Sequence, residues 1–219
     1  MFITFEGPDG SGKTSISKIV VERLQKEGYK VMLTREPGGN KIAEQIRNII
    51  LDKENTSLDA KAEALLYAAS RRQHLIEKVL PAIKRGEIVI CDRFIDSSLA
   101  YQGGGRNLGV EEILQLNLFA TDNIFPDLTL FFDISPEEGL QRLNHDTKRV
   151  VDRLDLESEA FHEKVYETFL DLTKRYKDRY VVINARKSIE EVAEATYQAI
   201  IKKLNENKWV FTKISTYPL

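Results

Sequence analysis

The stretch GPDGSGKT, residues 7–14, decides how the rest of the chain is interpreted. It follows the pattern G-x-x-x-x-G-K-T and lies between the apolar run FITFE (2–6) and a stretch of helical periodicity that starts at Ser15. Glycines in such a turn allow consecutive backbone N–H groups to point inward, and the helix that follows adds the positive end of its dipole. We therefore expect this turn to surround the phosphate groups of a nucleoside triphosphate.

Lys13 and Thr14 complete the expected phosphate site. Lys13 would reach the β- and γ-phosphates, and the hydroxyl of Thr14 would bind Mg²⁺. The pattern occurs in kinases, motor ATPases, switch GTPases and transport ATPases, so it does not define a reaction. A switch GTPase needs an Asn-Lys-x-Asp stretch after a strand, and neither LTLFFD nor YVVINA is followed by one. The residues of this turn expected to bind ATP are Gly7, Pro8, Asp9, Gly10, Ser11, Gly12, Lys13 and Thr14.

Short β-rich runs alternate with stretches of helical periodicity along the chain. The runs are nearly continuous in apolar residues, which is typical of parallel strands covered on both faces. Right-handed crossovers then predict an α/β fold with a doubly wound, parallel, five-stranded sheet flanked by helices, in a single domain over residues 1–204. The predicted strands are 2–6, 30–34, 88–92, 128–133 and 180–185, and the predicted helices are 15–26, 43–51, 60–84, 110–121, 158–175 and 189–204.

Two segments fall outside this alternation. The interval RLNHDTKRVVDRLDLES (142–158) is dense in charge and poor in core residues. It is either a solvated helix face or loop, or a short mobile lid over about residues 142–156 that carries arginines. The tail 205–219 extends past the last predicted helix and holds the only tryptophan, Trp209. It is either a frayed end or a segment that packs on a neighbour, and its three aromatic residues favour packing.

The composition excludes several classes of protein. Lys and Arg number 32 against 34 for Asp and Glu, a net charge of −2, whereas a general nucleic-acid or membrane-surface binder needs a basic excess. The one cysteine, Cys91, allows no internal disulfide and fits a reducing compartment. The first residues lack the features of a signal peptide, and the longest apolar runs are too short to span a membrane. We expect a cytoplasmic protein that binds neither nucleic acid nor membrane.

Charged residues follow two of the predicted strands. Asp92 and Arg93 come directly after IVIC, where a carboxylate beside the phosphate-binding strand can organise Mg²⁺ and an arginine can hold phosphate in a bidentate manner. The alternative is a surface ion pair at a strand end. Arg35 lies in a similar strand-end turn, TREPGG, and Arg47 follows on the next helix. So many guanidinium groups at strand ends of a near-neutral chain suggest that two phosphorylated ligands meet there.

A phosphate acceptor is already an anionic nucleophile, so its reaction needs positioning and charge neutralisation and no general base. This interpretation fits a sequence without a Ser/His/Asp or Cys/His constellation. His74, His145 and His162 are scattered, show no metal-ligand spacing and are expected at the surface. Cys91 is expected to pack within its strand.

A helix face and the segment after Arg93 offer further polar groups. Tyr67 and Arg71 are spaced i, i+4 and share one helix face. They could stack a base and hydrogen-bond its edge, or they could be a core tyrosine and a salt-bridged arginine, and the spacing leaves both possibilities open. The stretch SSLAYQ (97–102) follows Asp92-Arg93 closely enough to line the same cleft.

The motifs FEGPDGSGKT, TREPGG, EALLYAASRR, CDRFIDSSLAYQGGGR and DRLD occur in this order, and with them the chain resembles the bacterial thymidylate kinase family across roughly residues 1–204. The resemblance implies that ATP and dTMP react to ADP and dTDP, with Mg²⁺ dependence, an adenylate-kinase-like P-loop NTPase fold and a homodimer. The alternatives are another nucleoside or nucleotide kinase on the same scaffold, or a P-loop ATPase that serves as an interaction module.

The resemblance also implies roles for single residues that match the family's motifs. Asp9 takes the 3′-hydroxyl of dTMP, Tyr101 crowds a ribose 2′-hydroxyl, and Tyr67 stands where the family usually has a phenylalanine stacked on thymine. Arginines 35, 47 and 93 face the acceptor phosphate, while Arg71, Ser98 and Gln102 read the base. The implied substrate-binding residues are Asp9, Arg35, Glu36, Pro37, Arg47, Tyr67, Arg71, Arg93, Ser98, Tyr101 and Gln102, and the implied metal ligands are Thr14 and Asp92.

The resemblance further implies a catalytic role for the lid. Some relatives carry an arginine within the phosphate loop where this chain has Gly10, so the lid has to supply it. We assign Arg149, with Arg153 and Arg142 in support, as a group that neutralises the transferring phosphoryl when the lid closes. The implied catalytic residues are Lys13, Asp92, Arg93, Arg149 and Arg153, and Arg142 is implied to bind ATP.

Overall fold

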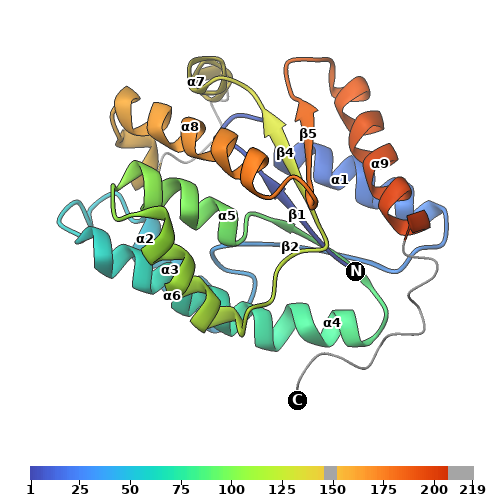
Figure 1. The fold of residues 1–219 in the computed structure, drawn as a ribbon, viewed down its shortest axis with the longest axis horizontal. Coiled ribbons are helices and arrows are strands. Elements are labelled where there is room, and N and C mark those ends of the chain that lie inside the picture. Colours follow the sequence, from blue (N-terminus) through green and yellow to red (C-terminus); the bar gives the residue numbers. More distant parts are fainter. Residues whose placement is uncertain (146–151, 207–219) are drawn as a thin grey trace.

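A five-stranded parallel sheet forms the centre of the computed structural model, which describes residues 1–145 and 152–206 (Figure 1). The strand order is β2-β3-β1-β4-β5, and every neighbouring pair is parallel. The predicted fold class is confirmed, and each predicted strand is present to within one residue at either end. The strands are β1 (Phe2–Glu6), β2 (Val31–Arg35), β3 (Ile88–Asp92), β4 (Leu128–Asp133) and β5 (Tyr180–Asn184).

Helices cover both faces of the sheet, as the near-continuous apolar strands predict (Figure 1). On one face α1 and α9 pack beside each other, and on the other lie the segments between β2 and β4 together with α8. None of the helices within the described ranges is both long enough and apolar enough to cross a bilayer. The helices are α1 (Lys13–Lys26), α2 (Lys41–Leu51), α3 (Ala60–His74), α4 (Leu80–Lys84), α5 (Ile95–Ser98), α6 (Val110–Thr121), α7 (Pro136–His145), α8 (Glu159–Arg175) and α9 (Ile189–Glu206).

Three tighter or wider helical segments complete the fold. The π-helical segment η1 (Leu75–Val79) joins α3 to α4, so the single helix predicted over 60–84 is a continuous run with a wider turn inside it. A second π-helical segment, η2 (Leu99–Gly105), continues α5, and this stretch was not predicted to be helical. The 3₁₀ segment η3 (Arg153–Leu156) follows the undescribed residues 146–151.

The structure describes only the two ends of the interval 142–158, so the lid stays a prediction. Residues 142–145 belong to α7, and 153–156 belong to η3. Asp152 caps η3, because its carboxylate accepts hydrogen bonds from the backbone N–H groups of Leu154 and Asp155. The tail 207–219, with Trp209, lies outside the described residues, as does Arg149.

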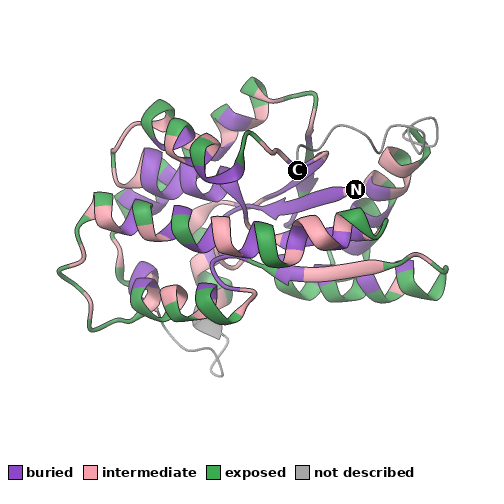
Figure 2. Ribbon diagram, turned by 90° about the horizontal axis from the view of Figure 1, so that it is seen from below, coloured by how far each residue is buried: buried purple, intermediate pink, exposed green. Residues whose placement is uncertain are grey.

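The core is divided in two by the sheet, and Figure 2 shows the buried strands between partly exposed helices. Alternate residues of β3 point to opposite faces, with Val89 in one cluster and Ile90 in the other. β1 lies at the centre, with β3 on one side and β4 on the other, so the strand order reverses beside it. In a doubly wound sheet, ligands bind at the carboxyl ends of the strands next to such a reversal. The turn 7–14 begins at that point.

Candidate active site

The phosphate loop connects β1 to α1 and has a backbone that only glycine fits at two positions. Gly7 has φ 141° and Gly10 has φ 75°, and both values are strained for residues with a side chain. A Cβ on Gly7 would lie 2.7 Å from the carbonyl oxygen of Phe132, and a Cβ on Gly10 would lie 2.1 Å from that of Gly139. The loop is therefore held closely against β4 and α7. The sequence pattern requires Gly7, whereas Gly10 occupies a position that the pattern leaves open.

Lys13 opens α1 and is buried beneath the loop. Its ammonium donates to the carbonyl oxygens of Gly7 (3.0 Å) and Pro8 (2.8 Å) and to the hydroxyl of Ser11 (3.0 Å). Burial, and next the charge of Arg93, lower the pKa of Lys13 to about 8. A bound phosphate would supply the negative charge that this buried cation lacks.

Thr14 and Asp92 come from different elements and meet beside the loop. The Thr14 hydroxyl at the start of α1 donates to the Asp92 carboxylate at the end of β3, over 2.8 Å. A hydroxyl and a carboxylate oxygen are hard donors of the kind that Mg²⁺ prefers next to substrate phosphates. These two residues fit the predicted metal site.

Arg93 follows β3 with φ 70°, an uncommon conformation for a residue other than glycine. This turn aims the guanidinium back at the phosphate loop, where it donates to Asp9 Oδ1 (2.7 Å), to the Gly7 carbonyl (3.1 Å) and to the Tyr101 hydroxyl (3.1 Å). The Tyr101 hydroxyl in turn donates to Asp9 Oδ2 over 2.8 Å. Burial opposes ionisation of Asp9, but the charges of Arg93 and Lys13 outweigh it and hold the pKa of that carboxyl below its ordinary range.

A cavity of about 610 Å³ extends from the phosphate loop past the ends of β2 and β3. Its walls include most of the predicted site residues, so segments far apart in the sequence converge on one space. Among the predicted residues that the structure describes, Gly7, Pro8, Ser11 and Arg153 are not in the walls. Those that line the cavity are Asp9, Gly10, Gly12, Lys13, Thr14, Arg35, Glu36, Pro37, Arg47, Tyr67, Arg71, Asp92, Arg93, Ser98, Tyr101, Gln102 and Arg142.

Sequence reasoning missed several further lining residues. The apolar side chains of Leu51, Leu143 and Leu154 contribute, and so does Asp152. Apolar residues near helix ends give no signal that separates a ligand wall from a core position. Asp152 lies in the charge-rich interval, but a single carboxylate there is not distinguishable from the solvated charges around it.

Two arginines that line the cavity share a hydrogen-bond partner. Arg35 donates to the Pro37 carbonyl over 2.7 Å, and Arg47 donates to the same oxygen over 3.0 Å. Arg35 also pairs with Glu44 on α2, over 3.0 Å. Burial, and next the charge of Arg35, lower the pKa of Arg47. Two cations held this close favour an anionic ligand between them and Arg93.

Arg71 is 2 % exposed and lines the same cavity. Its Nε donates to Glu36 over 2.8 Å, Nη1 donates to the Ser98 hydroxyl (2.9 Å) and to Asn117, and one Nη2 proton goes to the Phe94 carbonyl (2.9 Å). A guanidinium has five N–H groups, so one on Nη2 stays available to a ligand. The sequence does not identify Asn117, since a lone amide on an amphipathic helix has no distinguishing pattern.

For Tyr67 the structure combines the two predicted alternatives, a position in the core and a place in the cavity wall. The ring is buried in the core cluster on the α3 face, and it also lines the cavity. No described residue accepts a hydrogen bond from its hydroxyl. Burial, and next the charge of Glu63, raise the pKa of Tyr67, so the hydroxyl is a neutral donor facing the ligand space.

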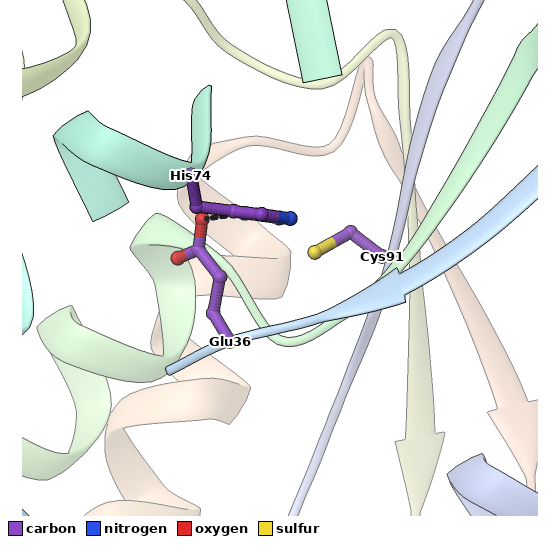
Figure 3. Close-up of side chains that lie close together, drawn as sticks. All are labelled: Glu36, His74 and Cys91. Carbon is purple, nitrogen blue, oxygen red and sulfur yellow. Dashed lines mark hydrogen bonds and ion pairs between the residues drawn. The ribbon is translucent and has the colours of Figure 1, made fainter. Parts of the chain in front are cut away.

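Figure 3 shows a buried cluster of Glu36, His74 and Cys91 beneath the TREPGG turn. The prediction that His74 is a surface residue is wrong, because α3 turns it inward to 0 % exposure; His162 is also buried. The ligand-type atoms of the three side chains lie within 4.8 Å of one another. However, His74 Nδ1 bonds to Glu36 Oε1 (2.8 Å), and Nε2 bonds to the Thr34 hydroxyl (2.7 Å).

Each donor atom of this cluster is therefore already in use. The Cys91 thiol donates to the Arg93 carbonyl over 3.1 Å, and burial, followed by the charge of Glu36, raises the pKa of the thiol well above its ordinary value. A metal ion would have to replace these hydrogen bonds, and a neutral buried thiol is not a nucleophile. The cluster orders the turn: Glu36 holds Arg71 with one oxygen and His74 with the other.

The two described arginines of the predicted lid, Arg142 and Arg153, lie in different surroundings. Arg142 projects from α7 and lines the cavity. Arg153 is 5 % exposed; it donates to the Ile50 carbonyl (3.0 Å) and to the carboxylate of Glu63. Its guanidinium is committed to anchoring η3 against α2 and α3, so the geometry gives no support for a direct catalytic role.

Comparisons with known proteins agree with this geometry. Residues 5–196 match the family model described as thymidylate kinase. The chain is 53% identical over 203 residues to a thymidylate kinase of Geobacillus sp. (strain WCH70), covering 93% of this chain and 97% of the relative. It is 53% identical over 208 residues to that of Enterococcus faecalis, covering 94% and 98%. The crystal structure of thymidylate kinase from Ehrlichia chaffeensis superposes with a TM-score of 0.75 at 35% identity, covering 91% of this chain and 98% of that one.

Proposed function

The chain belongs to the thymidylate kinase family, and on this premise we propose that it transfers the γ-phosphoryl group of ATP to the phosphate of dTMP within the cavity described above. One observation carries the proposal. The phosphate loop, three arginines from separate segments and the buried Arg71 all line a single space of about 610 Å³. These groups suit a triphosphate donor, a monophosphate acceptor and the acceptor's base.

We assign the phosphates of ATP to the phosphate loop and Lys13. The loop's backbone N–H groups and the ammonium surround the β- and γ-phosphates. Thr14 and Asp92 would hold Mg²⁺, which supplies charge neutralisation and orientation of the phosphates when it is bound. Arg142 of α7 lines the same cavity and would contact ATP. Arg149, outside the described residues, stays our candidate for the catalytic lid arginine.

We assign the phosphate of dTMP to Arg35, Arg47 and Arg93. Because that phosphate is anionic before the reaction starts, these residues need to bind and aim it rather than to remove a proton. Asp9 is ionised and is held by Arg93 and Tyr101, so it can accept a hydrogen bond from the 3′-hydroxyl. The Tyr101 ring beside it restricts the space for a 2′-hydroxyl.

We assign the base to the part of the cavity that Tyr67, Arg71 and Gln102 line. The remaining N–H group of Arg71 would donate to a pyrimidine carbonyl, Gln102 would contact the base edge, and Tyr67 would stack on the ring. Ser98 acts through Arg71, because its hydroxyl accepts one of the guanidinium hydrogens. The homodimer and the cytoplasmic location stay predictions.

The test is an acceptor panel. Purified protein with ATP and Mg²⁺ is given dTMP, dUMP, UMP, dCMP or AMP, and ADP release is measured. We expect rapid turnover with dTMP, slower turnover with dUMP and near-background rates with UMP, dCMP and AMP. Equal rates with all pyrimidines would contradict the base-reading and Tyr101 assignments. ADP release that does not depend on any acceptor would contradict the kinase proposal and favour an ATPase module.

A further inference from the structure

A buried ionic cluster holds Gln102, one of the residues that line the cavity. Its centre is Glu63 in the first turn of α3, which is 0 % exposed. Glu63 Oε1 accepts from Gln102 Nε2 over 2.8 Å and from Arg106 Nε over 3.3 Å. Its Oε2 accepts from Arg106 Nη2 over 3.1 Å and from Arg153 Nη2. Arg106 also pairs with Glu157, over 2.6 Å.

The carboxylate of Glu63 is ionised. Burial opposes its ionisation, but the hydrogen bonds from Arg106, Arg153 and Gln102 outweigh burial and lower its pKa. An ionised carboxylate only accepts hydrogen bonds, so the Gln102 atom that faces it has to be the amide nitrogen. The amide orientation of Gln102, which is otherwise ambiguous, is thereby determined.

Because the amide nitrogen of Gln102 faces Glu63, the amide oxygen is left for the cavity. The residue lines the cavity, and no hydrogen bond among the described residues uses its Oε1. That oxygen is therefore an acceptor available to the base. It complements a pyrimidine with an N3–H donor, such as thymine, and opposes cytosine, which has a lone pair at N3.

We propose that Glu63 is a specificity-determining positioning residue, which selects pyrimidines with an N3–H group by holding the Gln102 amide with its oxygen toward the base. Glu63 does not line the cavity and acts only through Gln102. The inference rests on the proposed function for the identity of the acceptor.

The variant Glu63→Gln (E63Q) tests the proposal, because it should reverse the orientation of the Gln102 amide. Arg106 and Arg153 only donate, so they attract the oxygen of the new amide and turn its NH₂ group toward Gln102. Gln102 then presents Oε1 to position 63 and its own NH₂ to the base. We expect the ratio of kcat/KM for dCMP to that for dTMP to rise by about tenfold or more, since a buried N3–H would face a donor. The ratio should rise without inverting, because the last N–H of Arg71 still opposes the cytosine amino group.

A matched control removes a charge from the same cluster without touching Gln102. Glu157→Gln breaks the second ion pair of Arg106 and leaves the Glu63–Gln102 hydrogen bond in place. We expect its dCMP to dTMP ratio to equal that of the wild type. General damage to the fold lowers both rates together and does not move the ratio. A ratio that changes equally in both variants would overturn the proposal.

A charge-conserving swap, E63Q with Q102E, provides the second test. It keeps one carboxylate in the cluster, and the oxygens at position 102 can only accept, so we expect the dCMP to dTMP ratio of the wild type to return. If E63Q alone does not fold, the folded swap decides: strong discrimination against dCMP supports the proposal, and loss of discrimination overturns it. A folded E63Q protein with an unchanged ratio also overturns it. Wild-type protein that does not phosphorylate dTMP would instead contradict the proposed function.

Discussion

At the scale of single residues, Glu6 shows how a buried carboxylate supports the site without touching the ligand. It ends β1 and is 0 % exposed. Its oxygens accept from the backbone N–H of Phe94 (2.8 Å) and from the Ser97 hydroxyl (2.5 Å), which flank the turn that carries Arg93. Burial, and next the charge of Asp96, raise the pKa of Glu6 from 4.5 to about 7.

This shift predicts a stability effect near neutral pH. The folded protein binds the Glu6 proton more tightly than the unfolded chain, so the contribution of Glu6 is fully present below pH 4.5 and is lost as pH rises through about 7. Relative to E6Q, the wild type should lose up to about 1.4 kcal/mol of unfolding free energy per pH unit in that window. Urea unfolding at several pH values measures the difference. The control is E22Q, at an exposed glutamate of α1, and identical slopes for wild type and E6Q would contradict the shift.

At the scale of elements, Asn40 fixes the position of α2. Its Oδ1 accepts from the Ala43 N–H over 2.8 Å and caps the helix, while its Nδ2 donates to the Gln73 carbonyl on α3 over 3.0 Å. One side chain thus begins α2 and ties it to α3. These two helices carry Arg47 and Arg71, which both line the cavity, so the tie helps to hold the two arginines in place.

Variants that remove one or both hydrogen bonds of Asn40 should lower the free energy of unfolding by different amounts. N40A should lower the unfolding free energy by about 2 kcal/mol, with about 1 from the cap and about 1 from the cross-helix hydrogen bond. N40D keeps the cap acceptor and should lose about 1 kcal/mol. D59A removes only the cap of α3 and serves as the comparison, with an expected loss of about 1 kcal/mol. Chemical denaturation measures all three, and equal losses for N40A and N40D would show that the cap contributes nothing.

At the scale of the whole molecule, apolar side chains are exposed on three helices that pack side by side. α3 packs against both α2 and α6 (Figure 1). On these helices Ile49 is 48%, Leu65 is 57% and Phe119 is 87% exposed. A phenylalanine this exposed is typical of a surface that a partner covers. We place the predicted homodimer contact on the outer surface of these three helices.

The dimer prediction has a direct test. F119E should shift the protein from dimer to monomer in sedimentation velocity, because it places a charge where an apolar contact is expected. Ile189 is 57% exposed at the start of α9, which packs against α1 on the opposite face of the sheet, so I189E is the matched control and should stay dimeric. A wild type that sediments as a monomer, or an F119E variant that stays dimeric, would contradict this placement.

The sequence by itself determined the features that local chemistry encodes. The glycines of residues 7–14 mark positive φ angles, and strands such as 88–92 and 128–133 were predicted with correct ends because near-continuous apolar runs need burial on both faces. The parallel sheet then brings strand ends together at one edge, which explains why most predicted site residues line one cavity. A motif of contiguous residues with a fixed backbone geometry can therefore be identified from the sequence alone.

Only the tertiary structure decided which polar groups face each other. The hydrogen-bond partners of Arg71 lie between 23 and 46 positions away in sequence, and the interior position of His74 follows from the way α3 packs on the TREPGG turn. Arg153 has the same charge and sequence surroundings as a lid arginine, yet Glu63 holds it in the interior. The physical reason is that a buried donor must find an acceptor wherever packing places one, and packing joins residues without regard to their separation along the chain.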